Sequence, residues 1–436
     1  MPTFRYPGSV GDSTDYRRRV LDNVLDDLFV ADGLRAIAIE GPKGVGKTST
    51  ASERAATVYR LDDAALLTVA QADPAMLLGG AKPVLIDEWQ RLPQSWDLVR
   101  RAVDDGAPGG SFLLAGSAQP SPPPMHSGAG RITQMRLRPL AFSERQLEEP
   151  RVSLAELLEG RRAGVSGRSD LAARDYTEEI VRSGLPGIRG LSPAARDVEL
   201  DGYITRVVQR DIPDETGLTL RSEDALRRWM AAYAAASAAT VSWEKVRDAA
   251  TPGEGTKPNR KATARYREAL SRLFLLDDVP AWLPSRSHLA ELGQAPKHHL
   301  ADPAIAARLL GVGVDALLRG EGEVVRDGPL LGALFESLVT LSLRVYAQAA
   351  HARVRHLRTQ RGEHEVDLIV ESGGGRVLAV EVKFTAAVQD RDVKQLHWLA
   401  GELGDDVLDL VVVNTGQHAY RRADGVAVVP LALLGP

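Results

Sequence analysis

Glycines surround a lysine and a threonine in residues 41–48, which read Gly-Pro-Lys-Gly-Val-Gly-Lys-Thr. The spacing is that of a phosphate-binding loop, G-x-x-x-x-G-K-T, and it lies between an apolar run and a helix-compatible segment. In such a loop, glycines let backbone N–H groups turn toward a polyphosphate, and the lysine reaches its β- and γ-phosphates. The threonine hydroxyl takes a Mg²⁺ position, while the next helix points its positive end at the anion. The sequence therefore predicts that ATP is bound by Gly41, Pro42, Lys43, Gly44, Val45, Gly46, Lys47, Thr48 and Ser49.

Two carboxylates, Asp87 and Glu88, follow the apolar run 83–86 downstream of this loop. A carboxylate at the end of a strand holds the Mg²⁺ of a nucleotide site, and its neighbour orients a water for attack on the γ-phosphate. We therefore expect Thr48 and Asp87 to be metal ligands and Glu88 to act on the water.

Ser117 and Arg131 are further candidates for the same reaction. Ser117 comes after the apolar run 111–115, where it could sense the γ-phosphate. Arg131 follows Gly128-Ala129-Gly130 and could supply positive charge to the transferred phosphoryl group, in its own subunit or in a neighbouring one. An ordinary surface arginine is an equal alternative for Arg131.

A second set of charged residues lies near the C-terminus. The segments 365–370 and 377–383 flank three glycines and are expected to form a β-hairpin. Alternation along the strand places Glu381 and Lys383 on one face, where Asp367 of the partner strand can meet them. Two such carboxylates can hold Mg²⁺ or Mn²⁺, and the lysine can position or deprotonate a water for attack on a phosphodiester.

Glu336 is expected to join this second site as a metal ligand together with Asp367 and Glu381. It lies inside an apolar helical segment, where an unpaired buried carboxylate would be costly. An alternative is that the C-terminal fold keeps its shape but only holds nucleic acid or a protein partner.

Charge points to a local rather than a general attraction to nucleic acid. The net charge of the whole chain is −4, so any basic surface must be local. Residues 257–272 contain six basic side chains and one acidic side chain, and they are expected to meet DNA phosphates from a helix-turn-helix. A solvated basic face packed on a neighbouring domain is the alternative.

Strands that alternate with helical segments in the N-terminal part predict a parallel α/β sheet that is covered on both faces. We expect an ATPase core at 1–138, a helical lid and connector at 139–220, a winged-helix domain at 221–290 and a nuclease-like domain at 291–436. The chain has no cysteine, so disulfides and thiolate zinc sites are excluded. Without a signal-peptide pattern or an apolar run near the roughly 20 residues of a membrane span, we expect a cytoplasmic protein with no membrane partner.

Several motifs taken together resemble one family. These are GPKGVGKT, LIDEWQRLP at 85–93, SGLPG at 183–187, KHHLADPAI at 297–305, HEVDLIV at 364–370 and AVEVKF at 379–384. The chain is similar along nearly its whole length to prokaryotic AAA-type ATPases that carry a C-terminal domain of unknown function. The resemblance implies an AAA-type core, a winged-helix middle part and a C-terminal domain with the PD-(D/E)XK restriction-endonuclease-like fold. Lys43 stands where such a protein would have arginine, and a proline is missing before Asp367. The oligomeric state is open, and DNA is favoured over RNA as the partner.

Overall fold

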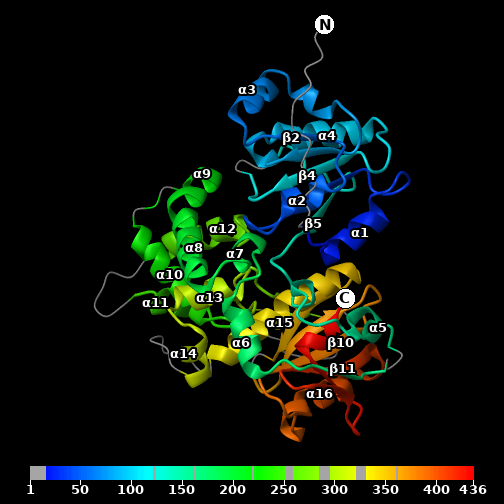
Figure 1. The fold of residues 1–436 in the computed structure, drawn as a ribbon, viewed down its shortest axis with the longest axis vertical. Helices are drawn as coiled ribbons and strands as arrows, with labels where there is room; N and C mark the ends of the chain where they lie inside the picture. The colour runs from blue at the N-terminus through cyan, green and yellow to red at the C-terminus, as the bar shows by residue number, and fades with distance from the viewer. Residues whose placement is uncertain are drawn as a thin grey trace.

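The computed structural model describes residues 16–120, 124–160, 164–218, 220, 222–251, 259–283, 295–320, 330–359 and 362–436. An N-terminal α/β part lies at the top of Figure 1, a helical part lies below it at the left, and a second α/β part lies at the bottom right. The C-terminal end of the chain is in the lower part, next to α15 and β10.

The N-terminal part is built on a five-stranded sheet with the order β2-β3-β4-β1-β5. All four neighbouring pairs are parallel. The strands are β1 (Ala36–Glu40), β2 (Thr57–Arg60), β3 (Val84–Asp87), β4 (Phe112–Gly116) and β5 (Ile132–Arg136). The first four lie where apolar runs in the sequence predict strands, at 34–39, 57–61, 83–86 and 111–115. Strand β5 is an additional strand whose alternating polar residues hid it. Strands β1, β3 and β4 are buried throughout, as expected for the centre of a parallel sheet.

Helices cover this sheet and connect its strands. They are α1 (Val20–Leu28), α2 (Lys47–Ser52), α3 (Ala64–Ala72) and α4 (Gln94–Asp104), with short 3₁₀ turns at Pro74–Leu78 and Trp89–Arg91. Alternate residues of the strands contact two apolar clusters, one on each face, so the sheet is the middle layer of three.

The segment expected to be helical from residue 139 onward differs from the prediction in its first third. Besides a 3₁₀ turn (Ser143–Arg145) and α5 (Leu154–Leu158), it contains two very short strands, β6 (Val152–Ser153) and β7 (Gly167–Arg168). Strand β6 pairs with β14 (Leu434–Gly435), and β7 pairs with β12 (His418–Arg421). Tertiary pairing with distant strands decides the structure here, because two residues carry no periodic pattern.

The helical part then runs through a series of packed helices. These are α6 (Ala173–Val181), α7 (Pro186–Arg189), α8 (Pro193–Arg206), a π-helical turn (Val207–Asp211), α9 (Ile212–Thr216), α10 (Glu223–Ala235), α11 (Trp243–Ala249), α12 (Arg260–Arg272), α13 (Pro303–Leu309) and α14 (Val314–Arg319). Helices α10, α11 and α12 are followed by antiparallel bridges between Leu276 and Leu300 and between Val279 and Lys297. Three helices followed by an antiparallel pair suit a winged helix, which stays a prediction.

The C-terminal part has a seven-stranded mixed sheet with the order β7-β12-β13-β11-β10-β9-β8. Its remaining strands are β8 (Arg353–Arg358), β9 (Glu365–Glu371), β10 (Val377–Lys383), β11 (Val407–Asn414) and β13 (Ala427–Pro430). Strands β9 and β10 pair antiparallel with Val377 opposite Glu371, which confirms the predicted hairpin. Helix α15 (Leu330–Ala349) packs on one face of this sheet and α16 (Asp390–Leu403) on the other. Short 3₁₀ turns at Gly404–Asp406 and Leu431–Leu433 complete this part.

Helix α15 corrects one expectation. It is long and apolar enough to cross a membrane by length and composition, although no apolar run of that kind was expected. Its most apolar window is 72% buried, because the helix packs between the N-terminal part and the C-terminal sheet. Burial in the core therefore accounts for its apolar composition.

Candidate functional site

The phosphate loop joins the end of β1 to the start of α2. Gly44 and Gly46 have φ angles of 81° and 98°, a conformation that favours glycine. A Cβ atom on Gly41 would lie 2.1 Å from the backbone oxygen of Leu137, so this position also requires glycine. The loop therefore has the tight backbone that lets successive N–H groups surround a phosphate.

Lys47 opens α2 and folds back over the loop. Its Nζ atom donates to the backbone oxygens of Gly41 and Pro42, each at 2.9 Å. Burial lowers the pKa of Lys47 to about 8, and the nearby charges of Glu88 and Asp87 oppose that shift. A phosphate in the loop would return the compensating negative charge to this ammonium group.

Thr48 and Asp87 lie together at the position predicted for a metal ion. The Thr48 hydroxyl is 3.0 Å from both carboxylate oxygens of Asp87. Burial, together with the charge of Glu88, raises the pKa of Asp87 to about 6. A hydroxyl and a carboxylate are oxygen donors of the kind Mg²⁺ prefers, so the residues fit this ion, and Thr48 and Asp87 would hold it.

Glu88, Gln90 and Ser117 form a hydrogen-bonded group beside these two residues. The Ser117 hydroxyl donates to Glu88 Oε2 at 2.9 Å, and Gln90 Nε2 donates to the same oxygen at 2.5 Å. Gln90 Nε2 also lies 3.2 Å from Ser117 Oγ. The structure therefore brings the predicted residues Glu88 and Ser117 together and adds Gln90, which the sequence analysis missed.

Lys43 connects the phosphate loop to the helical part. Its Nζ atom lies 2.6 Å from Asp211 Oδ1 and 3.6 Å from Glu215 Oε1. Asp211 closes the π-helical turn, and Glu215 is in α9. Neither carboxylate was predicted to contact the phosphate loop.

Arg131 lies away from the loop. It precedes β5, whose first residue pairs with Ala36 at the start of β1, whereas the loop follows the end of β1. Its guanidinium binds Asp104 at 2.7 Å and is 48% exposed. Within one subunit Arg131 therefore does not reach the phosphate loop, and of the two routes proposed for it only action on a neighbouring subunit suits this position.

Cavities flank the loop on both sides. One, of about 1210 Å³, is lined by Lys43, Gly44, Glu88 and Gln90 together with Tyr203, Arg206, Arg210 and Asp211. The other, of about 600 Å³, is lined by Val45, Gly46, Ser49 and Thr50 together with Tyr16, Arg17 and Pro186. Both reach residues of the predicted nucleotide site, so the space beside the loop suits a ligand of nucleotide size.

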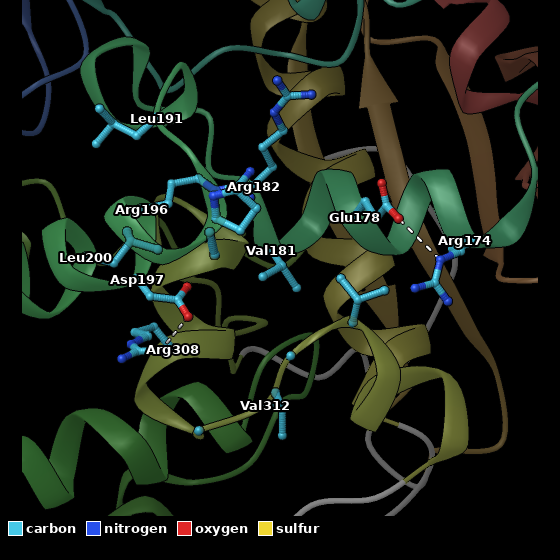
Figure 2. Close-up of a pocket in the computed structure, with 15 residues that line it drawn as sticks. Arg174, Glu178, Val181, Arg182, Leu191, Arg196, Asp197, Leu200, Arg308 and Val312 are labelled. Atoms are coloured by element: carbon cyan, nitrogen blue, oxygen red, sulfur yellow. Dashed lines mark ion pairs between the residues drawn. The ribbon is translucent and has the colours of Figure 1, made fainter.

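A third cavity, of about 700 Å³, is lined by residues of α6, α8 and α13 and of the turn at 311–314. Figure 2 shows Val181 between two ion pairs, Arg174–Glu178 and Arg308–Asp197, with Leu200 next to Asp197. Arg182 lines both this cavity and the one at Val45, so the two share a wall.

In the C-terminal part the predicted hairpin brings the expected charged residues together. Lys383 Nζ lies 2.6 Å from Glu381 Oε1, which confirms that the two side chains share a face. Asp367 reaches across the hairpin, and its Oδ2 atom accepts the backbone N–H of Val382 at 2.9 Å. Burial and the charge of Asp367 raise the pKa of Glu381.

A residue that the sequence analysis did not choose, Lys297, lies in the same centre. Its Nζ atom is 2.8 Å from Glu336 Oε1, 3.2 Å from Asp367 Oδ1 and 3.4 Å from Glu365 Oε1. Burial favours the neutral amine, but the charges of Glu336 and Asp367 outweigh it and raise the pKa of Lys297. Burial and the charge of Asp367 also raise the pKa of Glu336, to about 8.

This donor set does not suit a divalent ion. An ammonium group stands between Glu336 and Asp367, two of the predicted metal ligands, and a metal ion would have to displace it. Across the described parts of the chain, no group of three or more His, Cys, Asp and Glu side chains could hold a metal ion. The structure thus assembles Glu336, Asp367, Glu381 and Lys383 as predicted, but around a lysine.

Segments of the chain match three families. Residues 34–146 match a family described as an AAA domain, and residues 173–316 and 331–434 match two domains of unknown function, DUF8612 and DUF4143. The uncharacterized proteins Rv2008c of Mycobacterium tuberculosis and Mb2031c of Mycobacterium bovis are similar. Each is 26% identical over 414 residues, which cover 90% of this chain and 79% of the relative.

Two solved structures share weaker likeness. A proline-to-glycine mutant of RuvB from Thermotoga maritima is 17% identical with a TM-score of 0.26, covering 60% of this chain and 88% of its own. Cdc6p from Pyrobaculum aerophilum is 13% identical with a TM-score of 0.22, covering 59% and 85%. Scores this low do not establish a shared arrangement. The phosphate loop and the matched families together show that the chain carries an AAA-type P-loop ATPase domain, followed by two domains of unknown function.

Proposed function

We propose that this protein binds and hydrolyses ATP with Mg²⁺ and uses its nucleotide state to change how its helical and C-terminal parts engage nucleic acid. The observation that carries the proposal is the close approach of Thr48 to Asp87 beside the Glu88–Ser117 pair. Oxygen ligands for the metal ion and a carboxylate that can orient the attacking water then lie at the carboxyl ends of the strands of one parallel sheet. Ligands of α/β proteins bind at this edge.

In this mechanism each residue has a separate task. Lys47 leaves the carbonyl oxygens of Gly41 and Pro42 and binds the β- and γ-phosphates. Glu88 orients the attacking water, while Ser117 and Gln90 hold its carboxylate in place. Thr48 and Asp87 would hold Mg²⁺, which would supply charge stabilisation to the phosphates.

Contacts between the parts support a transmitted change. Lys43 of the phosphate loop binds Asp211 of the helical part. Farther along, Arg138 follows β5 and binds Asp277, which also lies 3.3 Å from Arg344 of α15. The buried carboxylate of Asp277, in the helical part, therefore contacts both the N-terminal part and the C-terminal part. A movement of the N-terminal part would therefore displace contacts with the other two parts.

Exposed basic residues on α12 support the nucleic-acid part of the proposal. Arg260, Lys261, Arg265 and Arg267 are exposed, although Arg267 stacks on Trp243. Arg272 fits the alternative that this basic segment packs on neighbouring parts of the chain, since it donates to the backbone oxygens of Gln119, Thr216 and Glu215. Lys257 lies outside the described residues. DNA is the favoured partner because a basic helix of this kind suits a major groove better than the deep groove of RNA.

Two wider expectations belong to this proposal. The protein works in the cytoplasm without a membrane, and several copies assemble so that Arg131 of one meets the nucleotide of the next. The C-terminal part could act as a PD-(D/E)XK-like nuclease or as a catalytically inactive binding domain, and the lysine in its carboxylate centre favours the second.

The test is steady-state ATP hydrolysis by the purified full chain, with and without duplex DNA, for wild type, Lys47→Ala and Glu88→Gln. We expect Mg²⁺-dependent turnover in wild type, loss of ATP binding in Lys47→Ala, and retained binding without turnover in Glu88→Gln. A wild-type protein that binds ATP but shows DNA affinity equal in the ATP and nucleotide-free states would contradict the coupling.

A further inference from the structure

Lys297 enters the carboxylate centre from a fixed piece of backbone. Its N–H and C=O groups pair with those of Val279, each at 2.9 Å. The next residues are held as well, because His298 Nε2 lies 2.8 Å from the oxygen of Val241 and His299 Nδ1 lies 2.9 Å from Ser337 Oγ. The backbone that carries Lys297 is therefore fixed by its neighbours, and the side chain enters the carboxylate centre from a rigid segment rather than from a flexible surface loop.

The ammonium group of Lys297 meets carboxylate oxygens from three residues. Glu336 on α15 and Asp367 and Glu365 on β9 all lie within 3.4 Å of Nζ, and the side chain is 1% exposed. A buried ammonium ion is stable only where opposite charges and hydrogen-bond acceptors surround it. The centre meets both conditions, so its most buried position already holds a cation.

Two other carboxylate oxygens of the centre have partners of their own. Asp367 Oδ2 accepts the N–H of Val382, and Glu381 Oε1 accepts a hydrogen bond from Lys383. Glu381 Oε2 is buried and has no hydrogen-bond partner among the described residues. A divalent ion needs several free oxygens at short distance, and the centre leaves too few of them while Lys297 is in place.

We propose that Lys297 takes the place of the divalent ion in this centre, so that the C-terminal part binds without metal-dependent cleavage. The negative charge that would attract Mg²⁺ or Mn²⁺ is neutralised by the chain itself, by Lys297 on one side and Lys383 on the other. This proposal rests on the proposed function only for what the C-terminal part binds. Within the site itself, the ammonium group of Lys297 excludes the metal ion.

The test measures Mn²⁺ binding by electron paramagnetic resonance on the full chain without nucleotide. Four proteins are compared: wild type, Asp367→Asn, Lys297→Met, and the double variant Lys297→Met/Asp367→Asn. Methionine is an unbranched, uncharged replacement that is one atom shorter than lysine, so it removes the ammonium group and leaves the rest of the buried volume largely filled. We expect wild type and Asp367→Asn to bind equally, since any Mn²⁺ then lies elsewhere, for instance at Thr48 and Asp87. Lys297→Met should gain one bound Mn²⁺ that the double variant loses.

Two outcomes would overturn the inference. One is Mn²⁺ binding by wild type that Asp367→Asn removes, and the other is a folded Lys297→Met protein that gains no Asp367-dependent Mn²⁺. If Lys297→Met does not fold, as judged by circular dichroism, the comparison of wild type with Asp367→Asn decides alone.

Cleavage of plasmid, single-stranded DNA and RNA, with Mg²⁺ or Mn²⁺ and with or without ATP, gives a second readout. Wild type should show no cleavage that Asp367→Asn removes, and any such cleavage counts against the proposal. ATP hydrolysis is measured on the same preparations. It should be unchanged in Lys297→Met, so a failure of the ATPase proposal is seen separately from a failure of this one.

Discussion

Lys43 and Asp211, which are 168 residues apart, form an ion pair of 2.6 Å between the phosphate loop and the helical part. Lys43 is 39% exposed in its side chain, so the pair contributes about 1 kcal/mol or less to stability. Its position matters more than its strength, because a bound nucleotide offers Lys43 competing phosphate oxygens.

Asp211→Asn should remove the shorter of the two ion pairs of Lys43, leave the one with Glu215 at 3.6 Å, and weaken the link between the nucleotide and the helical part. We expect ATP to protect the helical part from limited proteolysis less in this variant than in wild type. Asp214→Asn is the matched control, since among the described residues the ion pair of Asp214 is with the exposed Arg210, at 3.7 Å. Equal protection by ATP in wild type and in Asp211→Asn would show that the Lys43–Asp211 ion pair does not transmit the nucleotide state to the helical part.

Arg131→Ala tests assembly. Arg131 is distant from the loop of its own subunit, so ATP binding should be unchanged, and turnover per subunit should no longer rise with protein concentration. Arg100→Ala is the control, because Arg100 binds the same Asp104 at 2.7 Å. A loss of turnover that is the same at every protein concentration would contradict action on a neighbour.

The pH dependence of stability should report Asp87. Its pKa is raised to about 6 in the folded chain, so folding favours the protonated form. The nucleotide-free protein should therefore gain stability as pH falls through 6, by at most about 3 kcal/mol, and keep that gain below pH 4. Urea unfolding of wild type and Asp87→Asn between pH 4 and 8 measures this term as the difference between the two curves, which should shrink toward low pH.

Asp277→Asn should be among the most destabilising single changes. It removes the negative charge between the buried guanidinium groups of Arg138 and Arg344, at an expected cost of about 3–5 kcal/mol. These neighbours hold the pKa of Asp277 far below its usual range despite burial, so the loss should be constant between pH 5 and 8. Asp315→Asn, in an exposed pair with Arg174, should change the free energy of unfolding by less than about 1 kcal/mol.

Charge reversal on α12 tests the nucleic-acid surface. The double variant Lys261→Glu/Arg265→Glu should weaken DNA binding. It should also make the slope of log K against the logarithm of the salt concentration shallower by roughly 1 to 2 units, where K is the DNA association constant. Arg391→Glu/Lys394→Glu on α16 makes the same charge change on two exposed residues elsewhere. Fluorescence anisotropy across a salt series compares them, and an equal effect of both variants would move the contact away from α12.

Local motifs were sufficient for the nucleotide site. The residues from Gly41 to Thr48 are contiguous. Asp87 ends β3 and Ser117 follows β4, and these two buried strands are parallel neighbours whose ends meet at one edge of the sheet. The same holds for Asp367 and Glu381, because a hairpin brings its two strands into contact without reference to the rest of the chain.

The contacts between distant segments could not be predicted. Lys297 reaches Asp367 from 70 residues away, and no spacing rule connects them. The signals were that lysine is rare, with 9 among the 54 basic residues, that this one precedes two histidines, and that it opens the family motif at 297–305. Asp211 was missed for the same reason, because it lies 168 residues from Lys43. Gln90 lies two residues from Glu88 but also reaches Ser117, 27 residues away, so its place in this group depends on the pairing of β3 with β4.

The pairing of β6 with β14 and of β7 with β12 bears on how such proteins can be recombined. Strand β7 adds to the edge of the seven-stranded C-terminal sheet, and β6 forms a separate two-stranded sheet with β14, although the helical part separates both strands from the C-terminal part in sequence. A gene fusion that carried only residues 331–434 would expose the edge of β12 and leave β14 without its neighbour, which invites edge-to-edge aggregation. The C-terminal part can therefore be exchanged between relatives only together with the connector that follows the ATPase domain.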